Sequence, residues 1–376
     1  MSLLGVYVHL PFCPYLCPYC DFAKWPLRQS VAREYLAALD AELERTGREP
    51  ADTLFLGGGT PNAYDAETIT SLVRRLRERF YLQAGSEVTI EVNPELVRAD
   101  DFARYGAAGI TRVSIGVQSF VPAEIALLGR KHAPGDILPV VTAAREAEVA
   151  SLSLDLMFGV PGQTPESWKE SLDRAIALDV DHISTYGLTV ESNTPFAAWQ
   201  LREPAAFFDD VREAELYATA LDRLRDAGYE QYEISNFARH GHRCKHNENY
   251  WANGEYVGLG VGAASYRGGV RSVHVRSLER YVAAAAAGEE IPSDGERLEG
   301  FRRAGEAIML ALRTTQGVRL REFKIRYGVD ILEHYAPVLA RCSEGGLLEW
   351  TDDFMRLTER GRFVANDVCG AFVTFD

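Results

Sequence analysis

The feature that most constrains the fold is a regular alternation of short β-rich runs with longer helical patterns over the first two hundred or so residues. The expected strands are Val6–Leu10, Thr53–Leu56, Glu87–Val92, Arg112–Val117, Leu152–Phe158 and His182–Leu188. The helical patterns between them include Val31–Arg45, Ala66–Phe80, Ile137–Glu146 and Pro165–Leu178. Repeats of this kind predict an α/β fold with a parallel sheet, either doubly wound or closed as a barrel.

Polar and glycine-rich segments follow five of these expected strands. They are a cysteine-rich loop after the first, Gly57–Pro61 after the second, Glu91–Pro94 at the end of the third, Gly116–Gln118 at the end of the fourth and Gly159–Gly162 after the fifth. Barrel-like α/β folds collect their chemistry at the carboxyl ends of the strands. The sequence therefore predicts a functional site at this rim.

The cysteine-rich loop carries three thiols, those of Cys13, Cys17 and Cys20. The remaining cysteines are scattered, at Cys244, Cys342 and Cys369. This distribution is a poor disulfide framework and favours a metal site in a reducing compartment.

Thiolates select iron–sulfur clusters, zinc or copper. A [4Fe-4S] cube normally takes four thiolates, so three leave one iron open to an external ligand. Zinc is the alternative, with Cys244 or His246 as the missing ligand.

The chain is acidic, because 54 Asp and Glu residues against 40 Lys and Arg give a formal charge of −14. This balance argues against sequence-independent nucleic-acid binding, which needs many cations to neutralise phosphates. Met1–Gly5 carries no basic n-region, so we expect no signal peptide. Charges break every apolar run well short of the ~20 residues that a membrane span needs. A cytoplasmic protein is expected.

The pattern changes after residue 205. A helical stretch, Asp210–Ala227, leads into the aromatic and histidine-rich segment Tyr229–Tyr256 and then the glycine-rich segment Gly258–Ala263. An alanine run, Ala283–Ala287, precedes an expected boundary near Pro292.

The last part of the chain resembles a winged-helix-like α+β module. Apolar residues recur at helical spacing from Leu298 to Leu312, a hairpin is expected around Thr351–Asp353, and a final helix at Glu359–Val368. Such modules often bind DNA. Residues 296–376 carry 12 Lys and Arg against 13 Asp and Glu, so this nearly neutral segment favours a protein-packing or lid role.

The stretch from Tyr7 through Cys13 to Phe22 resembles the radical S-adenosylmethionine (SAM) superfamily. More narrowly, it is similar to the branch of the HemN coproporphyrinogen dehydrogenases and the HemW-type heme chaperones. The resemblance covers nearly the whole chain. It implies a partial (β/α)6 TIM-like barrel at residues 1–205, an extension at 206–292 and a HemN-type C-terminal domain at 293–376.

The resemblance also implies cofactors and their ligands. Cys13, Cys17 and Cys20 would hold a [4Fe-4S] cluster, with SAM on the open iron. The expected SAM neighbours are Tyr7, Tyr19, Gly58, Gly59, Thr60, Glu91, Gln118, Arg130, Asp155 and Gly187. The glycines would let backbone N–H groups approach the methionine carboxylate, Arg130 would pair with it, and Glu91 would accept from the ribose hydroxyls.

These residues also have plain structural interpretations. A Gly-Gly-Gly-Thr segment is often only a tight strand–helix turn. Glu91 and Asp155 could be ion-pair partners at the rim, and Arg130 a surface charge. Their joint match to one site favours the functional interpretation.

Three features favour the HemW-type chaperones over the dehydrogenases. The dehydrogenases carry a fourth cysteine two positions after the third, where this chain has Phe22. They also have a substantial N-terminal extension, whereas 12 residues precede Cys13 here. Finally, His246–Trp251 fits the HNxxYW pattern associated with HemW-type proteins.

The HNxxYW segment has its own chemistry. Neutral imidazole ligates heme iron, and Tyr250 and Trp251 offer flat faces to a porphyrin. His240, His242, Cys244 and His246 alternate, so on an extended segment they would share one face and could form a metal-binding tract. Alternatively, His246 only caps or hydrogen-bonds a loop. With the family resemblance, heme contact at His246, Tyr250 and Trp251 is favoured.

The sequence thus favours a heme chaperone that passes heme to apo-hemoproteins, respiratory and membrane-bound ones included. The alternatives are oxygen-independent coproporphyrinogen III dehydrogenase and another radical SAM reaction on a tetrapyrrole. Whether the chain is an enzyme is left open, although coproporphyrinogen III dehydrogenase activity is disfavoured. The oligomeric state, a homodimer included, is open as well.

Overall fold

The structure is a computed structural model that describes residues 4–98 and 100–373. The expectation for Met1–Gly5 therefore lies mostly outside the described residues, as does the end of the expected C-terminal domain. Within the described residues, no helix combines the length and the apolar character that crossing a membrane requires.

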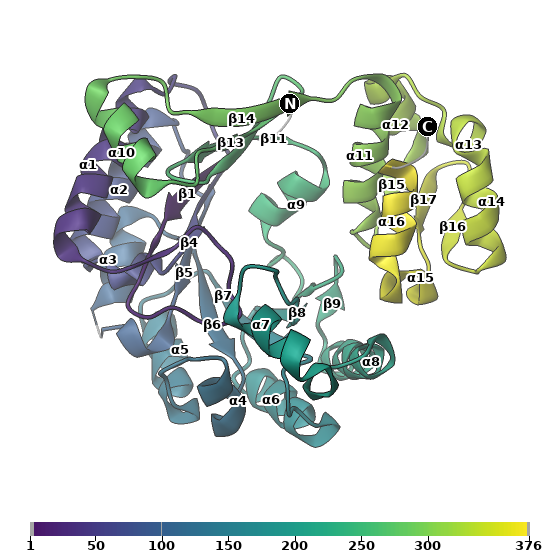
Figure 1. The fold of residues 1–376 in the computed structure, drawn as a ribbon, viewed down its shortest axis with the longest axis horizontal. Coiled ribbons are helices and arrows are strands. Elements are labelled where there is room, and N and C mark those ends of the chain that lie inside the picture. Colours follow the sequence, from purple (N-terminus) through teal and green to yellow (C-terminus); the bar gives the residue numbers. More distant parts are fainter. Residues whose placement is uncertain (1–3, 99, 374–376) are drawn as a thin grey trace.

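A twelve-stranded sheet organises the molecule (Figure 1). Six neighbouring parallel strands form its centre, in the order β1 (Leu4–Leu10), β4 (Thr53–Gly58), β5 (Glu87–Val92), β6 (Arg112–Gln118), β7 (Ser151–Phe158) and β8 (His182–Gly187). The expected partial barrel is confirmed. The expected strands differ from these by one or two residues at their ends, and β5 agrees at both ends.

Amphipathic helices cover the outer face of this sheet. They are α1 (Gln29–Arg45), α2 (Ala66–Arg79), α3 (Asp101–Ala108), α5 (Ile137–Glu146), α6 (Pro165–Ala177) and α8 (Asp210–Asp226). Their buried side chains share one apolar core with the strands. Two shorter helices, α4 (Pro122–Leu127) and α7 (Pro195–Arg202), complete this part of the chain.

The two faces of each strand differ because the inner face borders the barrel interior. In β5, Val88 and Ile90 are fully buried members of the apolar core. Glu87 and Glu91 alternate with them and therefore point to the other face. Glu87 lies at the amino end of the barrel and Glu91 at the carboxyl end. The inner face is thus polar at both ends.

Residues 206–292 extend the sheet at both edges. The elements are β9 (Glu230–Gln231), β10 (Asn236–Ala238), α9 (Lys245–Trp251), β11 (Glu255–Leu259), β12 (Ala264–Arg267), β13 (Val270–His274) and α10 (Leu278–Ala287). Strand β10 pairs antiparallel with β8, and β11 pairs parallel with β1. Strand β14 (Ser293–Arg297) pairs with β13, so the sheet continues past the expected boundary at Pro292.

The C-terminal module has its own apolar core. It contains α11 (Gly300–Leu312), β15 (Val318–Arg319), α12 (Leu320–Tyr327), α13 (Ile331–His334), α14 (Ala336–Glu344), β16 (Leu348–Trp350), β17 (Phe354–Leu357), α15 (Glu359–Phe363) and α16 (Ala365–Val373). The expected hairpin is β16–β17, whereas the expected final helix is two helices separated at Val364. In Figure 1 this module, green to yellow, lies beside the barrel with α9 between them.

Candidate functional site

The cysteine loop is fixed at both ends as it leaves β1. Strand β2 (Phe12–Cys13) pairs with β3 (Trp25–Pro26), which closes the loop. The backbone N–H of Leu27 donates to the carbonyl of Cys13 at 2.8 Å. The loop therefore holds its three cysteines over the carboxyl end of the barrel.

All six cysteines are free thiols. Cys13, Cys17 and Cys20 line one cavity of about 420 Å³, which we call the cluster cavity. Burial raises the pKa of the Cys13 thiol to about 11, and a hydrogen bond with Thr60 partly opposes this shift. Metal binding displaces such protons, so a buried thiol remains a competent ligand.

The donor set of three thiols is the ligand type of an iron–sulfur cluster. Within residues 4–98 and 100–373, no three His, Cys, Asp or Glu side chains already converge on one metal position. The thiolates of a cube bind separate irons and lie farther apart than the ligands of one zinc ion. The sulfur of Cys244, one candidate for a fourth zinc ligand, lies 3.5 Å from Oε1 of Glu87 at the other end of the barrel.

The glycine-rich loop after β4 lines the same cavity through Gly58, Gly59 and Thr60. A Cβ on Gly59 would come within 2.6 Å of the backbone of Pro11, so close packing requires glycine there. In this structure the three N–H groups donate within the protein, to Glu91, Leu10 and Phe12, respectively. They fasten the cysteine loop to β4 and β5.

Two carboxylates face the cluster cavity. Glu91 lines the cavity from β5, and Asp155 lines it from β7. Burial, and then the neighbouring carboxylate of Asp155, raise the pKa of Glu91 to about 7. Burial also raises the pKa of Asp155, which accepts from Oγ of Ser114 at 2.9 and 3.0 Å. Such a pair favours a ligand that brings hydroxyl or ammonium donors.

The same cavity contains a buried cation, Arg130, with 8% of its surface exposed. Its Nη2 donates to Oδ1 of Asn93 at 2.7 Å and to the carbonyl of Gly116 at 2.8 Å, while its Nε has no partner. No ion pair forms with it among the described residues. Because an unpaired buried charge is costly, the site favours a ligand with an anionic group.

A bulge in β6 presents Gln118 to the cavity. The pairing of β6 with β7 shifts between Gly116 and Gln118, and Gln118 has a φ of 65°. That left-handed conformation is uncommon for a residue with a side chain. A Cβ on Gly116 would lie 3.2 Å from Nη2 of Arg130, so glycine at 116 makes room for the guanidinium.

Two predicted SAM neighbours, Tyr7 and Gly187, do not line the cluster cavity. Tyr7 lines a second cavity, the aromatic cavity, which also contains Tyr250 and Trp251. Its hydroxyl is 3.0 Å from Nδ1 of His9. Gly187 lines a cleft near α8, where a Cβ would meet Glu213. Tyr19, in contrast, lines the cluster cavity as predicted.

The HNxxYW segment forms α9 and enters the barrel at its amino end. The carboxylate of Glu87 accepts from the N–H groups of Lys245 and His246 at 3.0 and 2.9 Å, and so satisfies the first turn of the helix. His246 is 1% exposed. Its Nδ1 lies 2.8 Å from Oγ1 of Thr53 and its Nε2 2.8 Å from the hydroxyl of Tyr250.

This geometry bears on two predictions for the segment. Burial lowers the pKa of His246 to about 3, so the ring is neutral, and both of its nitrogens have hydrogen-bond partners in this structure. The histidine-rich segment is not one extended face, because a helix begins at Lys245. His242 instead lies 3.8 Å from the carboxylate of Asp181.

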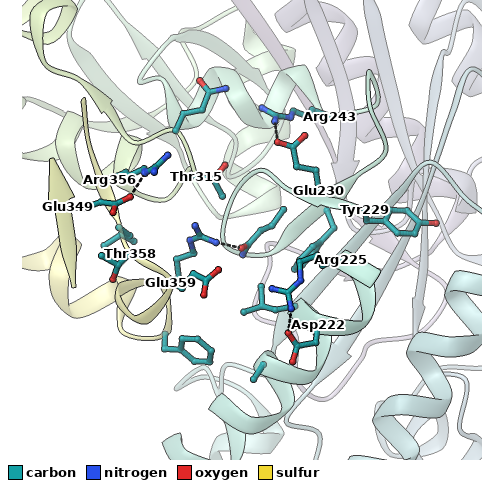
Figure 2. A pocket seen from close by; sticks show the side chains of 18 of the residues that line it. Asp222, Arg225, Tyr229, Glu230, Arg243, Thr315, Glu349, Arg356, Thr358 and Glu359 are labelled. Atoms are coloured by element: carbon teal, nitrogen blue, oxygen red, sulfur yellow. Dashed lines mark hydrogen bonds and ion pairs between the residues drawn. The ribbon is translucent and has the colours of Figure 1, made fainter. Parts of the chain in front are cut away.

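A larger cleft of about 910 Å³ lies between α8 and the β16–β17 hairpin (Figure 2). Six of its charged side chains form three ion pairs, Arg225 with Asp222, Arg243 with Glu230 and Arg356 with Glu349. None of the predicted site residues lines this cleft. Because most of its charged side chains are already paired, we assign the chemistry to the cluster cavity.

Several residues of the cluster cavity were missed from the sequence. They are Tyr15, Phe22, Lys24, Pro61, Val92, Asn93, Ser114, Gly116, Met157 and Tyr186. Asn93 and Gly116 lie in segments recognised as strand ends, so their position was a usable signal. Tyr15 was not recognisable, because its partner Glu95 is distant in sequence.

Comparisons with known proteins agree with this site. The radical SAM superfamily matches residues 7–175, and the HemN C-terminal domain matches residues 302–364. The heme chaperone HemW of Bacillus subtilis is 35% identical over 98% of this chain and 99% of its own length. HemW of Mycobacterium tuberculosis is 37% identical, over 97% and 93%. The solved structure of coproporphyrinogen III oxidase (HemN) from Escherichia coli is 26% identical, with a TM-score of 0.86 over 100% of this chain and 91% of that chain.

Proposed function

Because this chain belongs to the HemW family of heme chaperones within the radical SAM superfamily, we propose that it binds heme and delivers it to apo-hemoproteins. Phe22 carries the distinction from the dehydrogenases. It lines the cluster cavity where those enzymes have a fourth cysteine. The clients include respiratory hemoproteins, and the protein works in the cytoplasm.

The proposal includes two resident cofactors. Cys13, Cys17 and Cys20 hold a [4Fe-4S] cluster, which together with SAM supplies one-electron chemistry when bound. Arg130 pairs with the carboxylate of SAM, since it is a buried cation without an ion-pair partner in the described chain. Glu91 accepts from the ribose hydroxyls. Tyr19, Gln118 and Asp155 complete the pocket, and Gly58, Gly59 and Thr60 shape its wall.

Three parts of the chain divide this work. Residues 1–205 carry the cluster and SAM, residues 206–292 carry the HNxxYW helix, and residues 293–376 form the C-terminal domain. The aromatic cavity supports a cargo site in the last two parts, because Tyr250 and Trp251 of the HNxxYW helix line it together with Leu310 from α11. Heme therefore contacts Tyr250 and Trp251, and Nε2 of His246 holds the hydroxyl of Tyr250 at 2.8 Å.

A second candidate is oxygen-independent coproporphyrinogen III dehydrogenase. The likeness to HemN over the full chain favours it. One anaerobic experiment separates the two. Reconstituted protein receives SAM and a reductant with either heme or coproporphyrinogen III. The chaperone proposal expects a Soret band from bound heme and no protoporphyrinogen IX. Robust formation of protoporphyrinogen IX overturns it in favour of the dehydrogenase.

A further inference from the structure

The aromatic cavity adjoins the cluster cavity. It has a volume of about 450 Å³, and Phe22 lines both cavities. Its walls come from the barrel, the extension and the C-terminal module: Tyr7, His9, Phe22, Ala23, Tyr250, Trp251, Asn253, Tyr256, Gly262, Ala264, Arg271, Arg276 and Leu310. A ligand here would contact all three parts of the chain and lie next to the cysteine loop.

Aromatic side chains dominate these walls. The rings of Tyr250 and Tyr256 pack edge to face with centroids 4.6 Å apart, and Tyr7 and Trp251 lie on the same cavity. Aromatic faces contribute large apolar areas with little conformational freedom to lose. The cavity is therefore suited to a flat, largely apolar ligand.

Two arginines line the cavity, and they differ in their partners. Arg271 is occupied, because its Nε lies 3.0 Å from Oε1 of Glu306 and its Nη1 donates to the hydroxyl of Tyr256 at 2.8 Å. Arg276 is exposed and has neither an ion pair nor a hydrogen-bond partner within the described residues. A free guanidinium beside an apolar cavity is suited to a ligand carboxylate.

Asn253 supplies a second, independent polar group. It is 2% exposed, and its Oδ1 has no hydrogen-bond partner, while its Nδ2 lies 3.4 Å from the hydroxyl of Tyr327. Rotating the amide by half a turn lets Tyr327 donate to Oδ1 and leaves Nδ2 free to donate. Nε1 of Trp251 is also buried without a partner. Unsatisfied buried groups are costly, so a ligand that accepts from them gains affinity.

The C-terminal module holds Asn253 in this position. Arg326 donates to the carbonyls of Ala252 and Asn253 at 2.9 and 2.6 Å. Asn253 has a φ of 48°, a left-handed conformation. Arg313 lies over the ring of Trp251, with 5.0 Å between the guanidinium carbon and the ring centroid. The donors are therefore fixed by contacts outside the cavity before any ligand arrives.

We propose that the aromatic cavity receives the carboxylate-bearing edge of a flat tetrapyrrole, with Arg276 pairing with a carboxylate. Asn253 and Trp251 donate to the same anionic edge. This inference rests on the proposed function, since it assigns a site and a recognition chemistry to the heme cargo. It makes the carboxylates of heme, and not only its iron, a determinant of binding.

Binding of two probes tests the inference. Ferric heme and its dimethyl ester share the ring and the iron and differ in charge, and both are titrated by Soret absorbance. Wild-type protein is expected to bind the diacid at least about tenfold more tightly than the ester, and Arg276→Gln to lose that preference while still binding the ester. Arg280→Gln, on the exposed part of α10, is the matched control and should keep the preference for the diacid.

Asn253→Asp is a second variant, which places a negative charge in the cavity and should weaken binding of the diacid more than of the ester. Equal affinity of the wild type for both probes, or full preference for the diacid in Arg276→Gln, overturns the inference and leaves the chaperone function standing. Failure of the wild type to bind either probe overturns the proposed function as well.

Discussion

Nδ1 of His246 lies 2.8 Å from Oγ1 of Thr53, the first residue of β4. Because β4 runs parallel to β1, whose carboxyl end leads to Cys13, this bond puts the histidine at the opposite end of the barrel from the cysteine loop. Helix α9 thus closes the amino end, while the carboxyl end is left for the cluster cavity. The two ends of the barrel are therefore occupied differently, by a helix at one end and by the cysteine loop at the other.

Replacing His246 with Gln tests its structural role. The substitution disturbs two buried hydrogen bonds, each worth about 0.5–1.5 kcal/mol, so the free energy of unfolding should fall by about 1–3 kcal/mol. The position of the heme Soret band should stay as in the wild type. A shifted band in a variant of unchanged stability would instead identify His246 as an iron ligand.

Cys17→Ser should remove the cluster and keep the fold. Cys17 is half-buried at the cluster cavity, so losing one of three thiolates affects metal binding more than packing. We expect reconstituted variant protein to lose most of its iron and brown absorbance, with an unchanged far-UV circular dichroism spectrum. Cys342→Ser, in the separate C-terminal core, is the control and should keep its iron. Equal iron in both variants contradicts the ligand assignment.

Glu91→Gln should change how stability depends on pH. The folded pKa of about 7 lies above the ordinary value of 4.5, so between these values the unfolded chain has lost a proton that the folded chain keeps. The wild type therefore loses stability as pH rises from 4.5 to 7, by about 1–3 kcal/mol. Urea unfolding of cluster-free protein at pH 5 and pH 8 measures this. The variant should have a higher free energy of unfolding than the wild type at pH 8 but not at pH 5. An equal increase at both pH values would show that the raised pKa of Glu91 is not the cause.

Gly59→Ala should destabilise the fold, because there is no room for a methyl group at this position. Its Cβ would lie 2.6 Å from the backbone of Pro11, which cannot move without shifting the cysteine loop. Overpacking of this kind typically costs about 1–3 kcal/mol, and we also expect weaker cluster binding. Gly135→Ala, where a Cβ would have nothing within 4 Å, is the matched control. A Gly59→Ala protein as stable as that control, with full iron, would exclude the close packing described.

Much of the barrel was predictable because its signals are local. Strand β5 was predicted to the residue as a short β-rich run, and polar or glycine-rich segments after five of the strands marked one rim. The family resemblance placed Glu91, Gln118, Arg130 and Asp155 at one cavity, and all four line the cluster cavity.

The features that the sequence did not predict depend on contacts between residues far apart in the chain. Helix α9 has seven residues, too few for a clear helical period, and its first turn is stabilised by Glu87, which lies on a strand far away in sequence. Alternating histidines therefore looked like one extended face. Tyr7 lies in the middle of β1, below the rim, and its spacing from Cys13 did not reveal which cavity it lines.

Electron paramagnetic resonance of the anaerobically reconstituted, reduced protein, recorded with and without SAM, tests the central claim most directly. Three cysteines that leave one iron open predict about four irons per chain and a [4Fe-4S] signal that changes when SAM is added. Tetrahedral zinc in place of iron, or a cluster signal indifferent to SAM, would contradict the account.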